Sequence, residues 1–282
     1  MKKVLLIALP IILGLGLIAY PFVSGYLASR NATREIAGYK TQVRTLDPAV
    51  VERQLKEAKI YNDALAGDPV HDPFIPGSGI ALDQNYARVL DMGDGVMGHV
   101  SIPAIDVDLP IRHGTSSAVL LKGVGHVEGT SFPIGGARTH AVLTGHTGVS
   151  SARLFTDLTD LKKGDTFFIH VLDKTLAYQI DNIEVVLPSD TEDLRLVPGK
   201  DYVTLVTCTP YGVNSHRLFV RGVRIPYKPE LEKAAARRKK GLTHEQRLIV
   251  WTAAGTTAFM GVVIVVADAI KRHRDNRYIP KH

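Results

Sequence analysis

Short runs of apolar and β-branched residues, separated by turn residues, fill the middle of the chain. Most runs are bounded by Gly, Pro, Asp or Asn, which is typical of β-strands in all-β domains. The expected strands are 98–103, 107–111, 139–144, 166–172, 176–186, 202–207 and 217–225. Seven or eight short strands with few helices between them predict a mainly β fold, either a closed barrel of about eight strands or a sandwich. A short helix is expected at 151–161.

A helical pattern precedes these strands. Over residues 31–66 apolar positions recur with the spacing of one helix face, and Asp47 followed by Pro48 is typical of a helix start. Residues 67–79 then contain three prolines and three glycines, a composition that excludes both a helix and a central strand. We therefore expect a helical segment followed by an exposed loop or a segment laid over another surface.

Two long apolar segments lie near the ends of the chain, at 4–23 and 248–270. Each is close to the ~20 residues that a helix needs to cross the hydrocarbon core of a bilayer. For the first segment, Lys2 and Lys3 before the apolar run also fit a cleaved signal peptide. For the second, a buried core helix is the alternative, but the segment carries no charge before Asp268. Both segments are predicted to be transmembrane helices.

These patterns predict six regions. They are an N-terminal transmembrane helix or uncleaved signal anchor (1–30), a helical segment with the Pro/Gly-rich loop (31–80), the β domain (81–228), a basic linker (229–247), a C-terminal transmembrane helix (248–270) and a basic tail (271–282).

The net positive charge of the chain comes from its two ends. Residues 1–30 and 248–282 together hold eight Lys/Arg and two Asp, which accounts for the whole net charge of +6. Residues 31–247 are therefore neutral, with 26 basic and 26 acidic side chains. This placement favours a membrane over nucleic acid as a partner. Basic residues are balanced on the two sides of 248–270, so charge alone does not determine its orientation.

The only cysteine, Cys208, ends the apolar run 202–207. A single cysteine cannot form an internal disulfide, so its thiol is either buried packing or a nucleophile. A nucleophilic thiol needs a base. His146 follows another apolar run and lies between two glycines, so a substrate can approach it closely. Four other histidines lie in strand or loop contexts that favour structural roles: His99, His126, His140 and His170.

Arg217 adds a permanent positive charge near Cys208. A Pro-Tyr-Gly turn at 210–212 separates them, so two strands joined by this turn would bring both side chains to one end of a sheet. A guanidinium there can stabilise the oxyanion formed in acyl transfer. The alternative is a surface strand residue, like Arg221 and Arg224. The sequence has no Cys pair, no H-E-x-x-H and no phosphate-binding loop, so we expect no metal and no cofactor.

The segment T-L-V-T-C-T-P-Y-G-V-N-S-H-R-L-F-V-R-G at 204–222 resembles the T-L-x-T-C…R signature of sortases. The histidine segment 143–148 is similar to the corresponding sortase motif, and 124–129 and 148–161 also match. The resemblance covers about residues 70–227. Asp72, Pro73 and Phe74 are similar to the D-P-F/W lid of class C sortases, the pilus-assembling branch of the family.

This resemblance implies a sortase β-barrel and a transpeptidase. Cys208 would attack the Thr–Gly carbonyl of an LPXTG-type sorting signal, His146 would act as acid and base, and Arg217 would position the substrate and stabilise the oxyanion. A lysine amine of another pilin would resolve the acyl-enzyme. Asp72 would pair with Arg217 and Phe74 would cover Cys208 in the resting enzyme.

The resemblance also implies a location on the outer face of a Gram-positive cell membrane, with 24–247 outside and both termini cytoplasmic. Three alternatives remain. The acceptor could be the peptidoglycan precursor lipid II, as in housekeeping sortases. The same residues could serve a membrane-anchored cysteine protease that hydrolyses its substrate. A non-enzymatic β-sandwich adhesin or scaffold would instead carry Cys208 as packing.

Overall fold

The computed structural model describes residues 2–67, 70–74, 84–93, 95–149, 151–237 and a few positions between 250 and 265. Side chains are described from residue 13 onward. The chain divides into two compact units, 1–239 and 240–282. The first unit contains every predicted site residue, and the following description concerns it alone.

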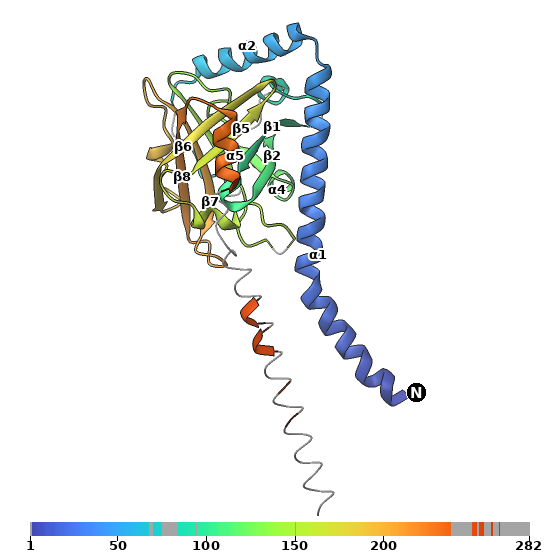
Figure 1. Cartoon of the computed structure of the whole chain (residues 1–282). Helices are drawn as coiled ribbons and strands as arrows, with labels where there is room; N and C mark the ends of the chain where they lie inside the picture. The colour runs from blue at the N-terminus through green and yellow to red at the C-terminus, as the bar shows by residue number, and fades with distance from the viewer. Residues whose placement is uncertain are drawn as a thin grey trace, which may run out of the picture. The chain divides into compact units, whose positions relative to one another are not determined.

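Eight strands of this unit close into a barrel (Figure 1). They are β1 (Val96–Ile102), β2 (Val107–His113), β3 (Val124–His126), β4 (Thr139–Thr144), β5 (Thr166–Val171), β6 (Lys174–Val186), β7 (Asp201–Thr209) and β8 (His216–Ile225). Their order around the barrel is β1-β2-β3-β4-β7-β8-β6-β5, and β5 pairs with β1 to close it. The β2–β3 and β4–β7 pairs are parallel and the others antiparallel. The predicted mainly β barrel is therefore confirmed.

The strand positions follow the sequence pattern closely, with one omission. All seven expected strands are present, shifted by a few residues at their ends. The sequence analysis did not predict β3, which has only three residues and is too short to show an alternating pattern. The helix expected at 151–161 is a single 3-10 turn, η2 (Thr156–Asp160).

The strands β4, β7 and β8 carry apolar side chains on both faces. Ala141, Leu143, Val203 and Leu205 belong to the main core, whereas the residues between them face outward. A second, smaller cluster forms there, and it contains Val70, Val127, Val142, Leu194, Val206 and Phe219. Because successive residues of a strand point to opposite faces, Cys208 lies on the same face as Val206, and Arg217 on the same face as Phe219. The predicted site is thus on the outer face of the barrel.

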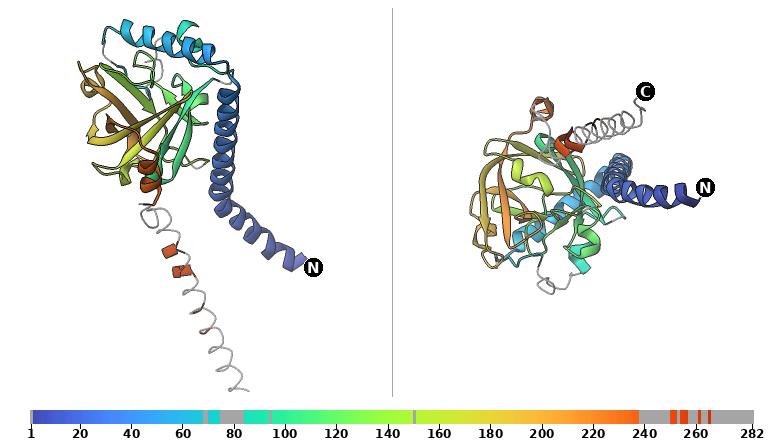
Figure 2. Two further views of the ribbon diagram at one scale, coloured as in Figure 1. Left: turned by 45° about the horizontal axis from the view of Figure 1, so that its top comes forward. Right: turned by 90° about the horizontal axis from the view of Figure 1, so that it is seen from below.

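Two helices precede the barrel, as expected. The C-terminal half of helix α1 (Lys2–Thr45) runs alongside it, the N-terminal half leads away from it, and α2 (Pro48–Ala64) lies across one end (Figure 2). Asp47 caps α2 by accepting a hydrogen bond from Ala49 N, which confirms the predicted helix start. Tyr39 of α1 ties β1 to the loop after β5, because its hydroxyl donates to Met97 O and accepts from Leu172 N. Helix α1 is therefore firmly docked on the barrel.

Short helices complete the first unit. They are α3 (Gln84–Arg88), η1 (Pro103–Ile105), α4 (Ser117–Leu120), η3 (Glu192–Leu194) and α5 (Pro229–Arg237). The loop predicted at 67–79 is described only at 67 and 70–74, where it forms neither helix nor strand.

The two predicted membrane-spanning helices are not supported by the structure. Within the described part of the chain, no helix combines the length and the apolar character required to cross a bilayer. Most of segment 248–270 lies outside the described residues.

Candidate active site

Cys208 and Arg217 face each other across two neighbouring strands. Cys208 is near the end of β7 and Arg217 near the start of β8, and the two residues are directly opposite in the antiparallel register. Side chains of directly opposed residues point to the same face, with Cβ atoms about 5 Å apart. The adjacency expected from the 210–212 turn is therefore confirmed. Cys208 is half-buried and carries a free thiol.

His146 reaches the same end of the barrel through a parallel strand pair. Thr144, the last residue of β4, pairs with Val206 of β7, so His146 and Cys208 each follow that pair by two residues. Two hydrogen bonds continue the contact between these segments beyond that pair. Gly145 N donates to Val206 O at 3.1 Å, and Thr207 Oγ1 donates to Gly145 O at 2.7 Å. The segment that carries His146 is thus tied to the strand that carries Cys208.

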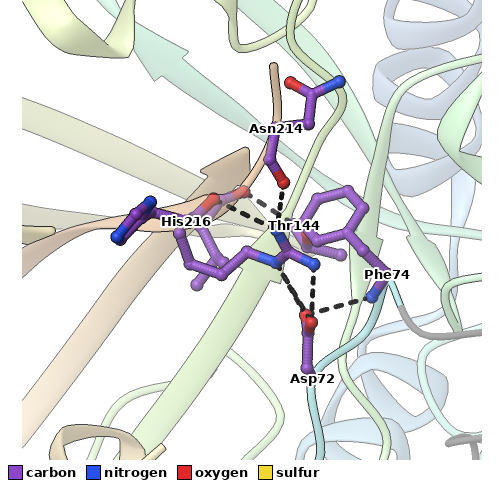
Figure 3. Close-up of polar contacts among 7 residues, drawn as sticks. Asp72, Phe74, Thr144, Asn214 and His216 are labelled. Atoms are coloured by element: carbon purple, nitrogen blue, oxygen red, sulfur yellow. Dashed lines mark hydrogen bonds and ion pairs between the residues drawn. The ribbon is translucent and has the colours of Figure 1, made fainter. Parts of the chain in front are cut away.

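A buried ion pair joins Arg217 to Asp72 (Figure 3). Arg217 Nη2 donates to Asp72 Oδ2 at 2.7 Å, and Nε lies 3.0 and 3.1 Å from the two carboxylate oxygens. The side chains are 8% and 2% exposed. On its other side the guanidinium donates through Nη1 to the carbonyl oxygens of Asn214 and His216, both at 3.1 Å. The pairing of Asp72 with Arg217 that the sequence analysis expected is present.

Phe74 lies between Arg217 and His146. Its ring is 5.1 Å from Arg217 Cζ, a cation–π distance, and its centroid is 5.7 Å from that of the His146 ring. The Phe74 amide also donates to Asp72 Oδ1 at 3.2 Å. Val70 and Phe74 pack on the outer apolar cluster defined above. Residues 70–74, including Pro73, therefore lie across the predicted site as a strap, and cover of Cys208 itself by Phe74 stays a prediction.

The electrostatics of the site favour uncharged side chains at Cys208 and His146. Burial raises the pKa of the Cys208 thiol, Arg217 opposes that rise and the Asp72 carboxylate adds to it. Burial lowers the pKa of His146. Both shifts favour the uncharged forms of the two groups, a thiol at Cys208 and a neutral imidazole at His146.

The four histidines expected to be structural each have an internal hydrogen-bond partner. His126 is bonded to the Tyr86 hydroxyl and to Ser131 O, and His140 to Thr204 and to a backbone carbonyl. Burial lowers the pKa of His126 to about 3 and that of His140 to about 4. Among the described residues, no group of three or more His, Cys, Asp or Glu could hold a metal ion.

Sequence reasoning missed two features of this site. The Thr207 hydroxyl bonds across strands to the histidine segment, and the carbonyl oxygens of Asn214 and His216 hold Arg217. The Thr207 contact involves a residue 62 positions away in sequence. For Asn214, the turn signals around it were visible and asparagine tolerates a left-handed backbone, but only the fold determines which donor its carbonyl oxygen meets.

Comparison with known proteins agrees with this geometry. Residues 100–225 match the family profile of the Sortase domain. The chain is 49% identical to the sortase C-1 of Streptococcus pneumoniae, with a TM-score of 0.66, over 69% of this chain and 100% of that one. It is 45% identical to a pilus-related sortase C of group B Streptococcus, with a TM-score of 0.63, over 67% of this chain and 96% of that one. It is 30% identical to the sortase D of Bacillus subtilis over 62% of this chain and 84% of that protein. Because these matches extend over nearly the full length of proteins with the same barrel, the chain belongs to the sortase family of cysteine transpeptidases, in its class C branch.

Proposed function

We propose that this enzyme joins pilin subunits through an LPXTG-like sorting signal, with Cys208 as nucleophile, His146 as acid and base, and Arg217 as the oxyanion partner. The observation that carries the proposal is the convergence of these three side chains at one end of β4, β7 and β8, under a strap held by Arg217 itself. The likeness to a pilus-related sortase supports pilin as the substrate.

The first half of the reaction forms a thioester. Neutral His146 takes the thiol proton as the Cys208 sulfur attacks the carbonyl carbon of the threonine in the sorting signal. The resulting oxyanion lies toward the Arg217 guanidinium, whose charge stabilises it most in the transition state. The Thr–Gly C–N bond then breaks, and the imidazolium of His146 gives its proton to the leaving glycine amine.

The second half transfers the acyl group. A lysine amine of another pilin attacks the thioester carbon, and His146 accepts the proton released by the amine. The C–S bond breaks and the proton returns to the Cys208 sulfur, which restores the resting thiol. The raised pKa of Cys208 and the lowered pKa of His146 suit this cycle, because the imidazole is free to act as base at the start of each half.

The strap 70–74 acts as a lid that blocks this cycle at rest. Asp72 occupies the Nε and Nη2 donors of Arg217, the donors that a substrate oxygen would need. Phe74 covers the space between Arg217 and His146. Substrate binding therefore requires the segment to leave, which replaces a buried ion pair by contacts to the substrate.

We further propose attachment to the outer face of a Gram-positive cell membrane, with both termini cytoplasmic, through segments 4–23 and 248–270. Apolar side chains that the barrel leaves uncovered on α1 support this proposal: Leu17 is 77% exposed, Tyr20 58% and Tyr26 65%. The neutral charge of 31–247 gives no support to nucleic-acid binding. Membrane fractionation of cells expressing the chain, with protease digestion of intact protoplasts, tests both the attachment and the side.

A peptide assay with the full chain in detergent tests the reaction. An LPXTG peptide is incubated with wild type and Cys208→Ala, either alone, with a lysine-bearing pilin, or with a peptidoglycan-precursor amine. The expected result is a pilin–peptide conjugate from wild type alone. Hydrolysis without conjugate would favour a protease, and transfer only to a peptidoglycan-precursor amine would favour wall anchoring. An active Cys208→Ala variant would refute the assigned nucleophile.

A further inference from the structure

The Arg217 guanidinium has two edges with different kinds of partner. Its Nε and Nη2 edge faces Asp72, a residue of the strap 145 positions away in sequence. Its Nη1 corner faces the carbonyl oxygens of Asn214, in the turn that leads into β8, and of His216, the first residue of β8 (Figure 3). The first set of partners leaves when the strap lifts. The second set is part of the same hairpin and remains.

Asn214 owes the direction of its carbonyl to an unusual backbone conformation. Its φ is 59°, in the left-handed region, which most residues with a Cβ avoid and which Asn tolerates best after Gly. Two hydrogen bonds close the turn before it, from Val213 N and Asn214 N to Pro210 O at 3.1 and 2.9 Å. The Asn214 side chain is exposed and points away from the guanidinium, while the carbonyl oxygen points toward it (Figure 3).

We propose that Asn214 is a positioning residue: its left-handed backbone directs its carbonyl oxygen to Arg217 Nη1 and keeps the free edge of the guanidinium aimed at the substrate once Asp72 has left. The proposal rests on the role assigned to Arg217 above. It assigns the function to the backbone geometry of residue 214, with the side chain serving only to make that geometry accessible.

The physical reason is the freedom that Arg217 would otherwise gain. An arginine side chain has many rotamers, and with Asp72 absent its Nε and Nη2 donors lose their bonds. The two carbonyl contacts at 3.1 Å then limit its rotation. A guanidinium held in place stabilises an oxyanion without reorganisation, whereas a displacement of about 1 Å at a reacting centre can lower the rate about a hundredfold.

The test uses the full chain in detergent, with Asp72→Ala present in every variant so that the strap does not compete. Asn214→Val carries a β-branched side chain that disfavours the left-handed region. Asn214→Gly keeps that region accessible and retains the carbonyl. Asp106→Val is the matched control, because Asp106 has φ 58° and is exposed between η1 and β2, two elements that carry no site residue. The readouts are kcat and KM for an LPXTG peptide, and the pH profile of Cys208 alkylation by iodoacetamide.

We expect Asn214→Val to lower kcat by about tenfold to a hundredfold with a smaller effect on KM, because misplacing Arg217 affects the transition state most. The pH at the midpoint of the alkylation profile should also rise, because a displaced Arg217 lowers the pKa of Cys208 less. Asn214→Gly should recover kcat to within about threefold of the Asp72→Ala parent, since glycine adopts the same backbone. Asp106→Val should lower thermal stability without changing either readout.

The outcomes separate this inference from the proposed function. An Asn214→Val variant with the parent's kcat and alkylation profile would overturn it, as would an equal loss in Asn214→Gly or Asp106→Val. If the parent itself neither cleaves nor transfers the peptide, the proposed function fails, and the alkylation profile still decides whether Asn214 positions Arg217. Where Asn214→Val reduces the folded fraction, Asn214→Ala, with a smaller side chain, replaces it.

Discussion

Replacing Asp72 by alanine should expose Cys208 without altering the nucleophile. The change removes three contacts between the strap and Arg217, all between 2.7 and 3.1 Å. A hydrogen bond to a charged group contributes about 1.5–3 kcal/mol, and desolvation of a buried pair offsets part of the sum. Val70 and Phe74 keep their apolar contacts, so we expect closure to weaken by about 2–3 kcal/mol. That corresponds to an increase of about 30- to 150-fold in the open fraction.

The rate of Cys208 alkylation by iodoacetamide measures this open fraction. If opening is fast compared with alkylation, the rate constant is proportional to the open population. Loss of the Asp72 charge acts in the same direction, because that carboxylate raises the Cys208 pKa. Asp181→Ala is the matched control: Asp181 accepts from Nε and Nη2 of Arg221 at 3.1 and 3.0 Å, on the same sheet but away from the strap. The urea-denatured chain gives the rate for full access.

Two results would refute this reasoning. Equal alkylation rates in wild type and Asp72→Ala would mean that the ion pair does not hold the strap over the thiol. Equal acceleration in Asp72→Ala and Asp181→Ala would mean that loss of any ion pair on this sheet loosens the barrel, and that the effect is not specific to the strap.

Three further predictions follow from the same contacts. Phe74→Ala removes the cation–π contact to Arg217, worth about 0.5–2 kcal/mol, and should speed alkylation by about 2- to 30-fold, whereas Phe74→Trp should leave it slow. Thr207→Val removes the hydrogen bond to Gly145 and should lower kcat about tenfold or more through displacement of the histidine segment, with recovery in Thr207→Ser; an unchanged kcat in Thr207→Val would contradict this positioning role. Urea unfolding of the full chain should show a loss of about 4 kcal/mol between about pH 7 and pH 5. His126 and His140 have folded pKa values of about 3 and 4, so over this range the unfolded chain binds more protons and stability falls as the pH falls; pH-independent unfolding would contradict it.

Much of the barrel and half of the site follow from local sequence. The positions of the strands can be predicted to within a few residues. Each run of apolar residues reflects the burial of one or both faces of its strand, and turn residues mark where the run ends. The adjacency of Cys208 and Arg217 could be predicted, since a short turn between two strands forces an antiparallel hairpin. The start of α2 could also be predicted, because Asp47 caps the helix through a hydrogen bond to a residue two positions away.

The remainder of the site depends on contacts between distant parts of the chain. His146 reaches the same end of the barrel as Cys208 only because β4 and β7 pair in parallel, and parallel pairing needs a long crossover that no local pattern specifies. Strand β3 exists only because its neighbours supply hydrogen bonds for three residues. Family resemblance suggested these residues, but their periodicity did not.

Residue types alone identify the groups that could do chemistry: a lone thiol, a glycine-flanked histidine, an arginine beyond a turn and a Pro/Gly-rich segment unable to join a sheet. The folded chain sets their arrangement. It laid residues 70–74 across Arg217, 145 positions away, and directed the Asn214 carbonyl to the opposite side of the same guanidinium. The physical reason is that burying a charged arginine requires partners for its donors, and only a complete fold determines which carboxylate and which carbonyl oxygens supply them.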